Sequence, residues 1–423
     1  MDTSSARTRL SLRPATFLAT LLAPVFWACA SAPRAAPEPA SHLGDVTAEG
    51  WEPADLDEAM ALLESRDDHA WEDHGRPLRV PRHPAEKVLQ GWVVALDPGH
   101  GGKADSPGYK RGPTGVREAE MNLRVAKLLR RLLEDAGAQV LLTREGETSE
   151  AADDRLDDTL KRRAEIANDA PRANGGVGAD LFISLHHNAS SKPTTNYPSI
   201  WFHGEADAAE VALDAALAVG HRIGAELRCS GVGVTSVLMN DRQMFKSGFG
   251  VLRHARVPAF LVESSFFSHP DEEQRLRDAL YNLREAYAIY LGLVEYAYGG
   301  RPTQTLPTVE ITDERIEVTT MLDEGLPDWW GADRQRVLSS TMTVTLDGKR
   351  LDVTYDPATR TLMATGERSR EAAEEHALSI HHANLYKHHN WPQRYRVRIS
   401  PDDSVDVQPT QAPHAAGPLP GTP

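Results

Sequence analysis

The sequence predicts an α/β fold, a mainly parallel twisted sheet with helices on both faces, followed by an all-β domain of the immunoglobulin-like sandwich type. Apolar runs alternate with helical patterns from Trp92 to about Tyr298, as in parallel sheets covered on both faces. The first of these runs is continuously apolar, which is typical of a fully buried strand. After Gly299 the pattern changes to short alternating runs, which are typical of antiparallel strands.

The length of 423 residues favours two domains with tails over a single core. We expect a signal segment at 1–29, a linker with a short helix at 30–90, the α/β domain at 91–298, the β-sandwich at 306–400 and a disordered tail at 401–423. The net charge of −15 argues against a nucleic-acid-binding protein, which would need a basic face.

The N-terminus has the pattern of an export signal. Three arginines precede an apolar segment at 15–28, which is too short for a comfortable transmembrane helix. The segment ends at Cys29 and resembles a bacterial lipoprotein signal, in which Cys29 would be acylated; cleavage after Ala30 is the alternative. Because Cys229 is the only other cysteine, no disulfide framework is expected, and Cys229 is interpreted as a small buried side chain.

The first strand and helix of the α/β domain have clear limits. Residues 92–96 form the apolar run, which leads into Asp97, and Pro and Gly residues at 98–102 predict an open turn after it. Leucines at helical spacing predict a helix over 118–134, which ends before Gly137. Similar reasoning predicts strands at 139–143, 180–185, 199–203 and 258–263, and helices at 156–168, 206–227 and 271–296.

The C-terminal part contains six short runs of alternating residues, which predict strands. Asp347-Gly348 joins two of them and is a strong hairpin signal. The expected strands are 315–320, 341–346, 350–355, 361–364, 376–381 and 394–399.

Four ionisable residues occupy comparable places in the α/β domain. His100 follows the first strand, Glu118 opens the first helix, His186 follows the third strand, and Glu263 closes a late strand. The carboxyl ends of parallel strands lie at one edge of a sheet, so these side chains are expected to converge there. Two histidines and one carboxylate are the ligand set of a catalytic zinc with an open position, and a second carboxylate would then serve as general base.

The sequence motifs around these residues are more specific than the spacing of the residues. Four motifs occur in order: Asp97-Pro-Gly-His-Gly-Gly102, Glu118-x-x-x-Asn-Leu123, Ser184-Leu-His-His-Asn-Ala189 and Val262-Glu-Ser-Ser-Phe-Phe-Ser268. Together they resemble the zinc-dependent N-acetylmuramoyl-L-alanine amidases of the type-3 amidase family. The resemblance covers about residues 91–298, half of the chain.

The resemblance implies a hydrolase. His100, Glu118 and His186 would hold one zinc ion, and Glu263 would polarise the metal-bound water and return a proton to the leaving amine. The substrate would be the amide between N-acetylmuramic acid and L-alanine of peptidoglycan stem peptides, in cell-wall remodelling or cell separation. The expected location is the periplasm or cell envelope, with or without a lipid anchor on the membrane.

Several alternatives remain open at this point. The adjacent His186 and His187 cannot both face the metal, because neighbours on an extended stretch point in opposite directions; His186 is assigned by register. A non-catalytic peptidoglycan-binding or scaffold protein, or a zinc amidase acting on soluble muropeptides, would share these motifs. The β domain would contact the wall, a regulator or the catalytic groove.

Other polar and aromatic residues have simpler interpretations. Glu118 also suits a helix N-terminus electrostatically, whether or not it binds metal. We interpret Glu120, His203, His254 and His269 as surface or groove residues rather than ligands, and the histidines at 381–382 and 388–389 as non-ligating. The tryptophans at 329–330 and 391 are interpreted as core packing rather than a carbohydrate platform.

Overall fold

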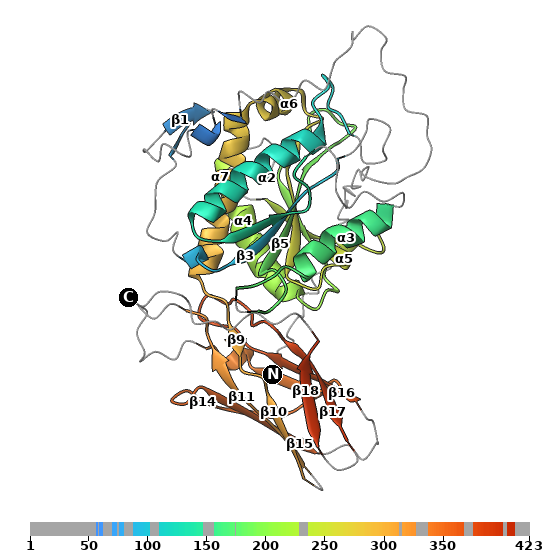
Figure 1. The fold of residues 1–423 in the computed structure, drawn as a ribbon, viewed down its shortest axis with the longest axis vertical. Helices are drawn as coiled ribbons and strands as arrows, with labels where there is room; N and C mark the ends of the chain where they lie inside the picture. Colours follow the sequence, from blue (N-terminus) through green and yellow to red (C-terminus); the bar gives the residue numbers. More distant parts are fainter. Residues whose placement is uncertain are drawn as a thin grey trace, which may run out of the picture.

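The computed structural model of the chain describes residues 56–57, 59–61, 70–73, 76–79, 88–101, 110–146, 156–173, 175–227, 236–312, 315–326, 337–367, 375–400 and 404–410. These residues form an α/β part and an all-β part, which Figure 1 shows one above the other. The predicted fold class is thereby confirmed.

The α/β part is built on a six-stranded sheet with the order β4-β3-β5-β8-β6-β7. Strands β4, β3, β5 and β8 run parallel, so their carboxyl ends lie at one edge. The strands are β3 (Val93–Pro98), β4 (Gln139–Leu142), β5 (Leu181–Asn188), β6 (Ser199–Phe202), β7 (Val237–Asn240) and β8 (Ala259–Phe266).

Helices cover both faces of this sheet, as Figure 1 shows. On one face lie α2 (Glu118–Asp135), α4 (Ala209–Leu227) and α7 (Ala279–Tyr298), and on the other α3 (Leu156–Asn168) and α5 (Gly250–Arg253). Alternate residues of β3 enter the two cores: Val94 and Leu96 face the first, and Val93 and Ala95 the second. Burial on both faces explains why the strand is apolar throughout.

Two details of the α/β part differ from expectation. Strand β6 runs antiparallel to β8, and β7, which was not predicted, pairs with β6, so the sheet is mixed at this end. The expected helix over 271–296 is two helices, α6 (Pro270–Arg277) and α7. The helix breaks at Asp278, whose backbone is extended and whose side chain accepts a hydrogen bond from the amide of Leu280, capping α7.

The C-terminal part is a sandwich of two antiparallel sheets, β10-β11-β15-β14 with β9 beside β11, and β13-β12-β16-β17-β18. Inward residues such as Val318, Val344 and Ile380 form its core. The strands are β9 (Thr303–Gln304), β10 (Thr308–Ile311), β11 (Arg315–Asp323), β12 (Thr343–Leu346), β13 (Lys349–Arg350), β14 (Asp352–Asp356), β15 (Thr361–Glu367), β16 (Glu375–His381), β17 (Arg394–Ile399) and β18 (Val405–Pro409).

The predicted tail and linker contain strands that were not expected, and the linker also contains helical backbone where a short helix was expected. Strand β18 lies within the predicted tail and pairs antiparallel with β17, where Val405 and Val407 pack against the core of the sandwich. In the predicted linker, β1 (Ala70–Asp73) and β2 (Arg76–Arg79) form a hairpin, and helical backbone occurs at residues 56–57 and 59–61. Ala59 is fully buried against the α/β core, which accounts for the order of this short helical stretch.

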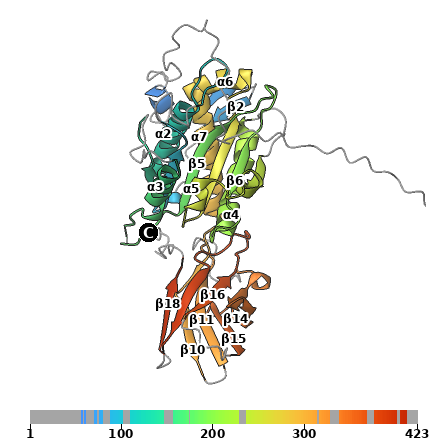
Figure 2. The same ribbon diagram turned by 90° about the vertical axis from the view of Figure 1, so that its right-hand side faces the viewer.

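The two parts meet at the amino-terminal edge of the parallel strands. Arg301 forms an ion pair with Asp180, directly before β5, and its guanidinium lies 3.9 Å from the centre of the Trp92 ring, directly before β3. Trp391 is buried against the start of α4. The contact lies opposite the carboxyl-terminal edge, so the alternative that the β domain packs back onto the catalytic groove is wrong (Figure 2).

No helix within the described ranges is both long and apolar enough to cross a membrane.

Candidate active site

His100 lies just beyond the carboxyl end of β3, in a strained turn. Its φ is 61°, in the left-handed region that non-glycine residues rarely adopt and that costs of order 1 kcal/mol or more. Two buried arginines hold the turn: Arg163 donates to the carbonyl of His100 at 2.6 Å, and Arg144 donates to the carbonyl of Gly99 at 3.0 Å. These bonds offset the strain and fix the direction of the imidazole.

Glu118 is the first residue of α2 and is fully buried. The loop before it is held by Glu273 of α6, whose carboxylate accepts hydrogen bonds from the amides of Thr114 (2.8 Å) and Val116 (3.2 Å). The amide of Glu118 itself donates to the carbonyl of Lys110. The backbone at Glu118 is therefore held both by the contacts of the preceding loop with Glu273 and by its own hydrogen bond to Lys110.

His186 lies near the carboxyl end of β5, beside β3 in the sheet. A β-carbon added to Gly99 would lie 2.2 Å from Cε1 and Nε2 of His186, so only glycine fits at that position of the turn. The glycine before His100 thus lets the second imidazole approach the first.

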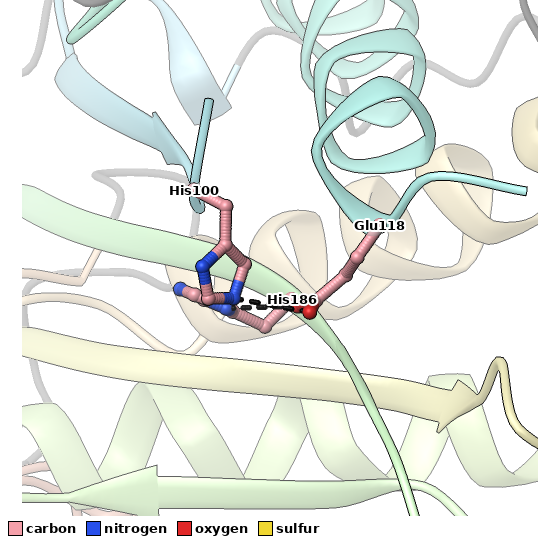
Figure 3. Close-up of side chains that lie close together, drawn as sticks. All are labelled: His100, Glu118 and His186. Atoms are coloured by element: carbon pink, nitrogen blue, oxygen red, sulfur yellow. Dashed lines mark hydrogen bonds and ion pairs between the residues drawn. The ribbon is translucent and has the colours of Figure 1, made fainter. Parts of the chain in front are cut away.

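The three side chains converge on one point, as Figure 3 shows. Nε2 of His100 lies 3.0 Å from Oε2 of Glu118, and Nδ1 of His186 lies 3.1 Å from Oε1 of Glu118. The imidazole rings are nearly perpendicular, with centres 4.7 Å apart. Their ligand atoms all lie within 4.8 Å of one another, close enough to share one metal ion. Within the part of the chain that the structure describes, this is the one such group of His, Cys, Asp or Glu.

The electrostatics of the site suit a cation. Burial alone would raise the pKa of a carboxyl, but the adjacent His100 and His186 hold the pKa of Glu118 well below its usual value. Burial lowers the pKa of His186, which favours the neutral imidazole that binds metals. Neutral imidazoles beside an ionised carboxylate are the donor set that zinc accepts in proteins.

Glu263 lies next to the triad on the neighbouring strand. Its Cα is paired in register with that of His186 between β8 and β5, and parallel partners project from the same face. Burial, together with the nearby negative charge of Glu118, raises the pKa of Glu263 well above its usual value. Its Oε2 atom is buried and has no hydrogen-bond partner among the described residues, so it is available to a substrate or water.

His187 points away from the triad, as the alternation along an extended strand requires. Its ring is only 2% exposed, and its two nitrogens lie close to Asn122 and Glu285. The register assignment of His186 as the residue facing the triad is therefore consistent with the geometry.

The remaining candidate residues of the α/β part lie outside the triad. Glu120 pairs with Arg117, His203 lies beside Asp241, His254 contacts Asp157, and His269 caps α6. The interpretation that they are surface or groove residues is wrong for Glu120 and His203, which are almost fully buried.

The C-terminal histidines have structural partners. His388 lies 2.9 Å from the carbonyl of Gly300, and His389 lies 3.1 Å from Asp214. Trp391 is 1% exposed and packs in the interface between the two parts, in agreement with core packing. Cys29, Cys229 and the tryptophans at 329–330 lie outside the described residues.

The sequence analysis assigned no structural role to the residues that hold the triad. Arg144, Arg163 and Glu273 reach the site from a loop and two helices remote in the chain. Arg163 shares the buried face of α3 with Ala164 and Ala167, and a charged residue at such a position is the one signal that pointed to a buried partner.

A sheet of parallel strands that brings two histidines and a carboxylate together at its carboxyl-terminal edge is typical of metal-dependent hydrolases. The family model described as N-acetylmuramoyl-L-alanine amidase matches residues 94–295. The α/β domain therefore belongs to the N-acetylmuramoyl-L-alanine amidase family, as the motifs predicted.

Curated relatives carry related names. A probable cell wall amidase LytH from Staphylococcus saprophyticus is 27% identical over 223 residues, which are 52% of this chain and 63% of that protein. A protein of the same name from Staphylococcus epidermidis is 27% identical over 49% of this chain and 59% of its own length. This chain thus spans less than two thirds of the length of these relatives.

Among solved structures, the N-acetylmuramoyl-L-alanine amidase AmiC2 of Nostoc punctiforme is 26% identical, with a TM-score of 0.39, over 49% of this chain and 97% of that one. The CwlD amidase of Clostridioides difficile, solved in complex with the GerS lipoprotein, is 23% identical, with a TM-score of 0.40, over 48% of this chain and 98% of that one.

Proposed function

We propose that the α/β domain is a zinc-dependent N-acetylmuramoyl-L-alanine amidase, which hydrolyses the amide between N-acetylmuramic acid and the L-alanine of a peptidoglycan stem peptide. The observation that carries the proposal is the convergence of His100, Glu118 and His186 beside Glu263 within a domain of this family. His100, Glu118 and His186 would hold the zinc ion.

A bound zinc ion supplies Lewis-acid chemistry, polarising a carbonyl and lowering the pKa of a coordinated water to about 7. Glu263 accepts a proton from the attacking water and delivers it to the leaving amine of L-alanine. Its unpartnered Oε2 and its position beside His186 support this role. The two arginine-held carbonyls of the His100 turn keep the triad rigid while the amide is cleaved.

A non-catalytic wall-binding protein is the alternative from another class. The structure of such a protein would have no need of a buried, unpartnered carboxylate atom, which is costly to maintain. The presence of Glu263 beside the triad therefore favours the enzyme.

We further propose how the chain is organised around this activity. Residues 1–29 would be an export signal with Cys29 as the acylation site, and residues 91–298 the catalytic domain. The β domain, extended to Thr303–Pro409 by β9 and β18, would contact the wall or a regulator. These assignments place the protein in the cell envelope, in cell-wall remodelling or cell separation. Transfer of Cys29→Ala from a detergent phase to an aqueous phase would support the anchor, and an unchanged partition would contradict it.

The reaction is tested by digesting purified peptidoglycan with the protein and identifying the products by mass. Stem peptides with a free N-terminal L-alanine are expected, and a chelator is expected to abolish them. Glu263→Ala is expected to lower the rate by about 10²–10⁴-fold, the usual contribution of a general base, while the bound zinc content stays at the parent level.

The roles of the base, the cleaved bond and the metal are tested separately by these measurements. A fully active Glu263→Ala protein would exclude Glu263 as the base. Release of products other than these peptides would exclude the proposed bond, and activity that survives metal removal would exclude zinc. Asp157→Ala, which removes an exposed carboxylate, is the matched control and should digest peptidoglycan like the parent.

A further inference from the structure

A buried chain of polar side chains lies directly behind Glu118. Nδ1 of His187 lies 2.9 Å from Oδ1 of Asn122, and Nε2 of His187 lies 3.0 Å from Oε2 of Glu285 on α7. The hydroxyl of Ser264 donates to the other carboxylate oxygen of Glu285 at 2.6 Å. All four side chains are at most 2% exposed, so these contacts are not open to exchange with solvent.

Asn122 joins this chain to the residues of the triad. Its Nδ2 donates to the carbonyl of Gly99 at 3.2 Å, next to His100, and reaches Oε1 of Glu118 at 3.5 Å. The amide of His187 donates to the same Glu118 oxygen at 3.2 Å. Contacts from one cluster therefore reach Glu118 and the backbone beside both His100 and His186.

The orientation of the Asn122 amide group matters because its two ends differ. Only Nδ2 can donate to Glu118, while Oδ1 in that place would repel the carboxylate. A donor at Nδ1 of His187 holds Oδ1 on the opposite side, and Glu285 in turn holds the imidazole. The Gly99 carbonyl favours Nδ2 on the side of the triad, and His187 favours Oδ1 on the opposite side at the shorter distance of 2.9 Å, so the two contacts together fix the amide in the productive orientation.

We propose that His187 is a positioning residue, anchored by Glu285, which acts through Asn122 to orient Glu118 for zinc. The inference rests on the proposed function, since it takes Glu118 to be a metal ligand. Partners of this kind, which hold a ligand from behind, typically change metal affinity by 10–100-fold when removed.

The zinc dissociation constant, measured by competition with a chromogenic chelator on the full chain, tests the proposal apart from activity. Glu285→Gln should remain near the parent value, because a glutamine amide can accept from or donate to Nε2 and leaves Nδ1 as the donor to Asn122. In that background, His187→Ala leaves no buried charge unpaired and should raise the dissociation constant about 10-fold or more.

A double-mutant cycle tests the route through Asn122. If His187 acts through Asn122, then His187→Ala should change zinc affinity little once Asn122→Ala is present. A purely structural role predicts equal effects in both backgrounds, and such a result would overturn the proposal. Thermal unfolding of the zinc-free variants verifies that each one is folded.

Two controls complete the design. His203→Ala removes another buried histidine paired with a carboxylate, at the end of β6, and should leave zinc affinity unchanged. His100→Ala should abolish high-affinity binding. If His100→Ala loses zinc and the His187 variants do not, the inference is wrong and the proposed function stands. If His100→Ala binds zinc as the parent does, both are wrong.

Discussion

At the scale of single residues, the site depends on charges that are buried in pairs. Asp97, at the end of β3, accepts hydrogen bonds from Arg163 at 2.9 Å and from Ser184 at 2.7 Å. Burial would raise the pKa of this carboxyl, but Arg163 and the hydroxyls of Thr143 and Ser184 hold it below its usual value. Asp97 and the His100 carbonyl share the same arginine, so the strained turn and the strand end are held together.

Asp97→Ala is predicted to lower the free energy of unfolding by about 3–5 kcal/mol, because it leaves the Arg163 guanidinium buried without its carboxylate. Urea unfolding at neutral pH measures the change. Asp157→Ala, which breaks an exposed pair with Arg253, should change stability by no more than about 0.5 kcal/mol. Similar losses in the two variants would contradict the view that burial makes the Asp97 pair important.

The sequence predicted which residues form the triad and did not predict what holds them. His100 follows the end of β3 and Glu118 begins α2, while His186 and Glu263 lie in the carboxyl-terminal halves of β5 and β8, so that topology brings all four together. The partners of His187 come from helices α2 and α7, 65 and 98 residues away. Such contacts depend on how helices are packed, and local patterns carry no information on this.

At the scale of elements, α4 and α7 approach closely at Gly292. A β-carbon at Gly292 would lie 2.4 Å from the Cα atom of Val219, so backbone meets backbone at this point. The absence of a side chain at Gly292 is what allows the two helix backbones to approach at this point.

Gly292→Ala is predicted to destabilise the protein by up to about 2 kcal/mol. Overpacking costs about 1–3 kcal/mol, and alanine otherwise gains about 1 kcal/mol within a helix. Thermal unfolding measures the change. Gly146→Ala, where nothing lies within 4 Å of the added carbon, should be close to neutral. A stabilised Gly292→Ala protein would show that the helices can separate without cost.

Elements were predicted well where their periodicity is strong and less well where it is not. Helix α3 has the limits that the pattern predicted, residues 156–168. The break at Asp278 was missed because apolar periodicity continues across it into α7. The direction of β6 was missed because an apolar run is the same whether its neighbour is parallel or antiparallel.

At the scale of the whole molecule, charged pairs join the β domain to the α/β domain. His389 lies 3.1 Å from Asp214 of α4, and Arg394 lies 2.7 Å from Asp207. The hydrogen bond with Asp214 raises the pKa of His389, with a further contribution from Glu210. Protonated His389 therefore stabilises the folded state.

Because the pKa is raised on folding, this contribution is fully present below the unfolded pKa of about 6.5 and is lost as pH rises through the folded pKa. His389→Ala is predicted to lower the melting temperature of the protein more at pH 5.5 than at pH 9. Calorimetry at both values measures the difference. An equal effect at both would mean that the charge of His389 adds nothing to the contact between domains.

The attachment of the β domain to the amino-terminal edge of the sheet sets a minimum distance between the β domain and the triad. On β5, His186 of the triad lies six residues after Asp180 at that edge, about 20 Å away at roughly 3.3 Å per residue. A polymer bound by the β domain would be held at least that distance from the amide that the proposed active site hydrolyses. The protein would then work as a fixed spacer, whose anchor point and cutting point fall on separate places along a polymer.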